Sequence, residues 1–163
     1  MIAGTNSGCG KTTVTCAVLQ ALVNRKFNVS SFKCGPDYID PMFHKTVIGT
    51  AAYNLDTYLM SNDAVNYLLN KNSGDIAVIE GVMGFYDGFS FTEKGSTHEL
   101  SEITDTDVIL VVNCRGMSLS AMALVKGFKE FRKNNIKGVI FNNLSEKLYG
   151  NCLLYTSPSP RDA

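Results

Sequence analysis

The sequence predicts an α/β fold, in which helices flank a mostly parallel sheet. Four apolar runs have the length and composition of short buried strands, at residues 29–32, 76–79, 108–112 and 139–141, and helical patterns separate most of them. The chain has 163 residues, 45% of them hydrophobic, which is enough for one ordinary core and too little for two generous ones. We therefore expect a single domain.

A further strand and several helices complete the expected fold. Residues 1–3 have the composition of the end of a buried first strand. A helix over residues 11–25 carries an apolar stripe at helical spacing, made of Val14, Ala17, Val18, Ala21 and Leu22. After the second strand the sequence predicts a loop over residues 33–41 and then a short helix over 63–70, capped by Ser61 or Asn62. A further short helix is expected over 96–104. Ser118 is expected to cap a longer helix that reaches about Asn134.

The end of the chain departs from this pattern. Residues 151–163 form a Ser/Pro-rich run where an α/β unit needs its next helix, so the predicted fold is incomplete at the C-terminus. The run resembles translated sequencing-adaptor read-through, and a disordered tail is the alternative. We place the domain at residues 1–150 and assign the tail no function.

Composition excludes several classes of function. The 15 Lys and Arg residues balance 15 Asp and Glu, so we expect no broad attraction to nucleic acid or to an anionic membrane surface. No stretch approaches the roughly 20 apolar residues of a membrane span, and no secretory leader pattern is present, so we expect a cytoplasmic protein. The five cysteines form no C-x-x-C pair, and neither a disulfide framework nor a zinc site is indicated.

Residues 4–13, Gly-Thr-Asn-Ser-Gly-Cys-Gly-Lys-Thr-Thr, predict a backbone cradle for the phosphates of ATP. Lys11 would reach the β- and γ-phosphates, and the Thr12 hydroxyl would bind Mg²⁺. The spacing is a variant, because Gly4 lies one place before the usual glycine position. A glycine-rich turn is the alternative, but the strand before it and the helix after it favour nucleotide binding. The predicted contacts are Thr5, Asn6, Ser7, Gly8, Cys9, Gly10, Lys11, Thr12 and Thr13.

Charged side chains follow two of the predicted strands. Lys33, Asp37 and Asp40 come after the second strand, on a segment that Pro36 and Pro41 restrict. One or both aspartates would bind Mg²⁺, and Lys33 would balance the charge of phosphate or of an acidic substrate. An Asx-turn with two solvated aspartates is the alternative.

Two more strands end in polar residues. Glu80 follows the third strand, where P-loop enzymes place a carboxylate near the metal, so we expect it opposite Thr12. Asn142 ends the last recognisable strand and can bond to an adenine edge, although turn formation explains it equally well.

The order of these motifs resembles the cobyrinic acid a,c-diamide synthase family. The resemblance covers nearly all of residues 1–150 and rests on six segments: GTNSGCGKTT, FKCGPDYIDP, NLDTYLM, EGVMGFYDG, GSTHELS and NCRGMSLS. Dethiobiotin synthetase shares the fold and the G-T-x-x-x-x-G-K-T loop, so the resemblance implies a P-loop NTPase-like, dethiobiotin synthetase-like architecture. The MinD-type ATPases fit less well, because their additional lysine would fall at Asn6.

The resemblance implies ATP-dependent amidation of two acetate side chains of a corrinoid ring, with ammonia from glutamine hydrolysis and an acyl-phosphate intermediate. It assigns catalysis to Lys11, Lys33, Asp37 and Asp40, and Mg²⁺ binding to Thr12, Asp40 and Glu80. Asp37 and Asp40 can exchange these roles. The expected partners are cobyrinic acid or a related tetrapyrrole, a glutaminase domain that would lie after residue 150, and, as an open possibility, a second copy of the chain.

Other functions fit the same residues. The substrate would then be another tetrapyrrole, nickel sirohydrochlorin or hydrogenobyrinic acid, or the enzyme would be a dethiobiotin synthetase-like ligase. A different class of hypothesis makes the chain a non-catalytic, ATP-dependent switch that binds a partner protein. The lysine and two acids beside the phosphate loop favour an enzyme.

Overall fold

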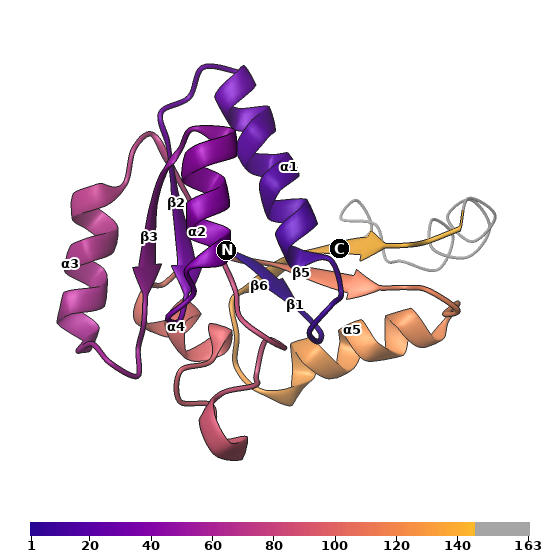
Figure 1. Cartoon of the computed structure of the whole chain (residues 1–163). Coiled ribbons are helices and arrows are strands. Elements are labelled where there is room, and N and C mark those ends of the chain that lie inside the picture. Colours follow the sequence, from indigo (N-terminus) through magenta and orange to yellow (C-terminus); the bar gives the residue numbers. More distant parts are fainter. Residues whose placement is uncertain (146–163) are drawn as a thin grey trace.

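A computed structural model describes residues 1–145 and shows a six-stranded parallel sheet in the order β3-β2-β4-β1-β5-β6 (Figure 1). The strands are β1 (Ile2–Gly4), β2 (Val29–Cys34), β3 (Ala51–Leu55), β4 (Ile76–Glu80), β5 (Val108–Asn113) and β6 (Ile136–Asn142). The α-helices are α1 (Lys11–Asn24), α2 (Ile39–Phe43), α3 (Asn62–Asn72), α4 (Thr97–Ile103) and α5 (Ser120–Phe131). The predicted α/β class and parallel sheet are thus confirmed, whereas the prediction for residues 151–163 lies outside the described residues.

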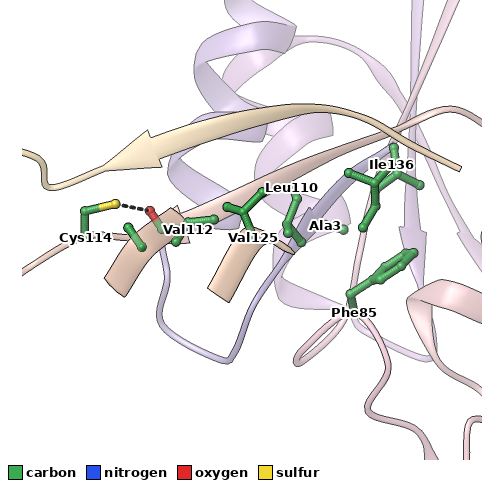
Figure 2. Packing of buried hydrophobic residues seen from close by; sticks show 9 residues of the cluster. Ala3, Phe85, Leu110, Val112, Cys114, Val125 and Ile136 are labelled. Atoms are coloured by element: carbon green, nitrogen blue, oxygen red, sulfur yellow. Dashed lines mark hydrogen bonds between the residues drawn. The ribbon is translucent and has the colours of Figure 1, made fainter. Parts of the chain in front are cut away.

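Helices cover both faces of the sheet, and each strand contributes side chains alternately to the two faces. Val111 of β5 packs on the α1 side, together with Leu19 and Val78. Its neighbours Leu110 and Val112 pack on the other side against α5 (Figure 2). On that same side, α3 and α4 cover β2, β3 and β4. Figure 1 shows α1 and α5 on opposite sides of β1 and β5.

The same alternation places polar residues under α1. In β2, Val29 belongs to the cluster beneath α1, whereas Phe32 and Cys34 pack on the opposite face. Ser31 and Lys33 therefore lie on the α1 side. The phosphate loop connects β1 to α1, so the carboxyl ends of β2 and β4 and the start of α1 surround one region, where open parallel sheets bind ligands.

Several predicted elements need correction. The short helix α2 (Ile39–Phe43) begins within residues 33–41, where we expected a loop. The π-helical turn η1 (His44–Ile48) and strand β3 after it were not predicted. Helix α5 begins at Ser120 and ends at Phe131, and the residue before it is Leu119, so Ser118 is not its N-cap. The Ser61 cap is confirmed, because its hydroxyl accepts a hydrogen bond from Ala64 N.

None of the helices within residues 1–145 has both the length and the apolar character needed to span a bilayer.

Candidate nucleotide-binding site

The phosphate loop turns at two glycines with positive φ, Gly8 at 75° and Gly10 at 101°. Gly4 has a different role: a Cβ atom there would collide with Cys9 Sγ and with the Lys11 side chain. Cys9 is fully buried under this close approach and fills space in the cluster beneath α1. The early position of the first glycine therefore has a packing reason, which explains the variant spacing of the loop.

The other predicted loop residues differ in exposure. Thr5 N donates to Val111 O of β5 at 3.2 Å, so this residue continues the sheet pairing. Asn6 and Ser7 are exposed at the tip of the loop, and Thr13 is exposed in the first turn of α1. Their contact with a nucleotide stays a prediction.

Lys11 is buried and reaches across to the loop that follows β4. Its Nζ donates to the backbone carbonyl oxygens of Met83 at 2.5 Å and Asn6 at 3.1 Å. Burial lowers the pKa of Lys11, although Cys9 and the carboxylates of Glu80 and Asp87 act in the opposite direction. The ammonium is thereby held between the two loops that would enclose phosphate.

Lys33 and Glu80 are direct neighbours in the sheet. They are paired in the register of β2 with β4, and Lys33 Nζ lies 3.0 Å from Glu80 Oε1. The same ammonium lies 2.6 Å from Asp40 Oδ2, and Thr12 Oγ1 donates to Glu80 Oε1 at 2.5 Å. Four residues predicted from three separate motifs, Thr12, Lys33, Asp40 and Glu80, thus form one cluster.

Burial sets the electrostatics of this cluster. Glu80 has no exposed surface, and its burial raises its pKa against the opposing effects of Lys33 and Thr12. For Lys33, burial alone would lower the pKa, but the Asp40 hydrogen bond and the Glu80 charge outweigh it, so the pKa is raised. Lys33 therefore stays positively charged, and it compensates the acids on both sides of it.

The two aspartates are placed differently from each other. Asp40 lies in the first turn of α2 rather than on a loop, and this helix directs it to Lys33. Asp37 forms an Asx-turn: its Oδ1 accepts from Ile39 N at 2.9 Å, and its Oδ2 lies 3.8 Å from Lys33 Nζ. The distances favour Asp40 over Asp37 as the partner of Lys33, while the chemical role of each stays a prediction.

Two supporting residues were not anticipated. His44 is fully buried; its Nδ1 lies 2.6 Å from Ser31 Oγ, and its Nε2 lies 3.6 Å from Glu80 Oε2. Asn54 of β3 donates from Nδ2 to Gly35 O and Asp37 O, which fixes the turn before α2. Two features of the sequence could have pointed to these residues: His44 lies three residues after Pro41, and Asn54 lies near the end of a strand.

Asn142 contacts the phosphate loop itself. Its Nδ2 donates to Cys9 O at 2.9 Å, its Oδ1 accepts from Asn143 N at 3.0 Å, and a Cβ atom on Gly10 would collide with its amide. The side chain supports the loop backbone, and adenine recognition by it stays a prediction.

The donors present fit Mg²⁺. Within residues 1–145 no three His, Cys, Asp or Glu side chains gather into a complete metal cage. Mg²⁺ beside a nucleotide, however, usually needs one or two carboxylates, with water and phosphate as the other ligands. Thr12 Oγ1 and Glu80 Oε1 meet at the start of α1, and the buried Glu80 Oε2 has no hydrogen-bond partner among residues 1–145. A hydroxyl and a carboxylate with a spare oxygen suit this hard cation.

The chain is similar to known nucleotide-binding domains. The model of the CobQ/CobB/MinD/ParA nucleotide binding domain matches residues 1–152. Among curated proteins, the cobyrinate a,c-diamide synthase of Thermoplasma volcanium is 49% identical over 147 residues, which cover 89% of this chain and 32% of that protein. Proteins with the same description from Priestia megaterium and Methanocaldococcus jannaschii are 46% and 44% identical, covering 90% and 87% of this chain and 33% and 32% of theirs.

The chain therefore spans about a third of the length of the curated relatives it matches. The family match, by contrast, covers all of the described residues, including the phosphate loop, the cluster of Thr12, Lys33, Asp40 and Glu80, and the six strands. The chain belongs to the CobQ/CobB/MinD/ParA nucleotide-binding domain family.

Proposed function

We propose that this chain is the ATP-binding part of a ligase that amidates the a and c carboxylates of cobyrinic acid. The observation that carries the proposal is the position of Lys33, whose ammonium lies between Asp40 and Glu80 at 2.6 and 3.0 Å, beside the phosphate loop. A nucleotide switch has less need of a lysine and several acids there. The names of the relatives supply the substrate.

The proposed reaction has two steps. A carboxylate oxygen of the substrate attacks the γ-phosphorus of ATP, which releases ADP and leaves an acyl phosphate. Ammonia then attacks the acyl carbon, phosphate departs, and the amide nitrogen loses a proton. Phosphoryl transfer of this kind depends on positioning and on compensation of negative charge.

The residues of the site divide these tasks. The phosphate loop holds the triphosphate, and Lys11 compensates charge on the β- and γ-phosphates. Lys33 directs the incoming substrate carboxylate toward phosphorus, and Asp40 and Asp37 hold Lys33 in place. Thr12 and Glu80, with Asp40 as a further donor, would bind Mg²⁺, which supplies charge stabilisation and orients the phosphates.

Ammonia would come from glutamine through a glutaminase domain, which is not part of residues 1–150. The proposal can therefore be tested with free ammonium. Purified chain is incubated with ATP, Mg²⁺ and ammonium chloride, with or without cobyrinic acid. ADP release and the masses of the corrinoid products are measured. We expect ADP release that depends on cobyrinic acid, together with mono- and diamide products.

Two variants control this experiment. Lys11→Ala should abolish ADP release, because the ammonium that compensates the γ-phosphate is lost. Lys71→Ala should leave it unchanged, because that lysine packs on Tyr67 of α3. ATP binding without any carboxylate-dependent turnover or corrinoid binding, combined with ATP-dependent association with another protein, would favour a switch and contradict the proposal.

Competition with nickel sirohydrochlorin and hydrogenobyrinic acid identifies the preferred ring.

A further inference from the structure

A second cavity adjoins the phosphate site. It has a volume of about 330 Å³, within the range of small-molecule sites. Its walls come from three segments that are distant in sequence: the turn at Gly35 and Pro36, the turn after β3, and the loops after β4. The apolar side chains that line it are Tyr58, Leu59, Val82, Met83 and Phe89.

Among the described residues, Lys94 is the only basic side chain lining this cavity, and its Nζ lies over the Tyr58 ring at 5.2 Å from the ring centroid. Within residues 1–145, no Asp or Glu side chain forms an ion pair with Lys94. The wall holds one acid from the described part of the chain, Asp56, which is nearly fully buried and accepts from Tyr58 N and Leu59 N at 2.8 and 3.2 Å. The cavity thus offers an apolar surface and one available cation.

The walls are held together without a ligand. Glu99 Oε2 accepts from Thr57 Oγ1 and from Gly95 N, both at 2.6 Å. This one carboxylate oxygen joins the turn that carries Tyr58 to the segment that carries Lys94. A cavity fixed in this way loses little conformational freedom when a ligand enters.

Backbone strain occurs at one residue of the cavity wall and in the loop beside it. Met83, which lines the cavity, has a positive φ of 43°, although it is not glycine. Ser90 and Phe91, which follow the wall residue Phe89 but do not line the cavity themselves, have positive φ values of 48° and 61°. The Met83 carbonyl accepts from Lys11 Nζ, so the cavity and the phosphate site share this residue. Phe89 and Phe91 are largely exposed in the same loop, on the turn η2 (Phe89–Phe91). Strained non-glycine residues persist where the surrounding structure holds them, and they concentrate at binding sites.

We propose that this cavity binds an apolar edge of a multiply carboxylated macrocycle, and that Lys94 pairs with a carboxylate other than the one being activated. This inference rests on the proposed function and specifies its substrate site. The cavity holds one edge of a ring, so a neighbouring carboxylate can reach Lys33 and the γ-phosphate. Lys94 would then determine which ring carboxylate is presented.

Binding of cobyrinic acid tests the proposal, because the corrin ring absorbs visible light and its spectrum can be titrated with protein. Lys94→Ala should raise the Kd for cobyrinic acid about tenfold or more, since a charge-assisted contact is lost. Lys94→Arg should largely restore binding. The Kd for ATP should stay the same in both variants. Lys71→Ala is the matched control, because Lys71 Nζ also lies over a tyrosine ring, that of Tyr67 at 5.3 Å, but Lys71 lies on α3 and does not line the cavity.

A second ligand separates charge from apolar contact. Fully esterified cobyrinic acid keeps the ring but carries no carboxylate, so Lys94→Ala should not change its Kd. Phe89→Ala should weaken binding of both the acid and the ester. If the wild-type chain binds cobyrinic acid and Lys94→Ala binds it equally well, the cavity proposal is wrong while the proposed function stands. If the wild-type chain binds no cobyrinic acid, both are wrong.

Discussion

Strands β2 and β5 each lie one strand in from an edge of the sheet, and both are mostly buried. Their buried side chains differ, because those of β5 are apolar and half of those of β2 are polar. In β5, Val108, Leu110 and Val112 pack into an apolar cluster on one face (Figure 2), and Val111 packs into another on the opposite face. All six residues of β2 are buried, and three of them, Ser30, Ser31 and Lys33, are polar. One strand stabilises the fold by burying apolar surface, and the other places polar groups where they are costly.

The comparison indicates that β5 contributes to the stability of the fold, whereas β2 also contributes residues to the candidate site. A buried ammonium is tolerated in β2 because Asp40 and Glu80 compensate its charge. Helix α1 covers that face, and its first turn supplies Thr12 to the same cluster. Changes in β2 should therefore affect stability and function together, whereas changes in β5 should affect stability alone.

The largest effect is expected from Lys33→Met. Removing the ammonium leaves the buried Glu80 without its main compensation, which should lower the free energy of unfolding by about 3–5 kcal/mol. Cobyrinate-dependent turnover should be lost as well. Adding Glu80→Gln to this variant should restore much of the stability, because no uncompensated acid remains, but none of the turnover. Denaturant unfolding and ADP release measure the two effects; full stability in the single variant contradicts the comparison.

Leu110→Ala tests the apolar strand. This fully buried side chain packs against α5, so its truncation should cost about 2–5 kcal/mol of unfolding free energy. The Kd for ATP should not change, as measured by titration calorimetry under conditions where the variant is folded. Ile109→Ala, on the same strand but 38% exposed, is the control and should cost less. A weaker ATP affinity in Leu110→Ala would show that β5 also determines the site.

His44 should give the smallest effect, visible as a dependence of stability on pH. Burial lowers the pKa of His44, with the Asp40 charge opposing. As the pH falls below about 6.5, the unfolded chain takes up this proton before the folded chain does, so stability is lost on acidification. In His44→Gln this part of the slope should disappear. Denaturant midpoints between about pH 7.5 and pH 5 measure it; an unchanged slope would mean that His44 does not titrate in this range.

The parallel sheet could be predicted because its central strands are apolar runs bounded by glycine and polar residues. Strand β3 was missed because it lies at the sheet edge, is half exposed, and contains polar Asn54. Helix α2 was missed because Pro41 was interpreted as a loop residue. Proline is in fact compatible with the first turn of a helix, where its missing N–H has no intrahelical partner.

The site was predictable where a functional residue lies at the carboxyl end of a strand. Lys33 and Glu80 could be placed together because the carboxyl ends of parallel strands meet at one edge of the sheet. His44 and Asn54 could not be placed, since their roles depend on the direction of the chain after α2. The cavity beside Lys94 is formed by three segments that are distant in sequence, and no local sequence pattern predicts that they lie together.

The contact between Asn142 and Cys9 bears on the order in which the protein assembles. It joins residues separated by 133 positions, so the chain must be synthesised at least as far as β6 before the phosphate loop has this support. Contacts this distant in sequence form late, because the chain between them must first be ordered. A nascent chain that ends before β6 would carry the complete Gly-Lys-Thr motif without the strand that supports it, and nucleotide would gain its full binding site only near the end of folding.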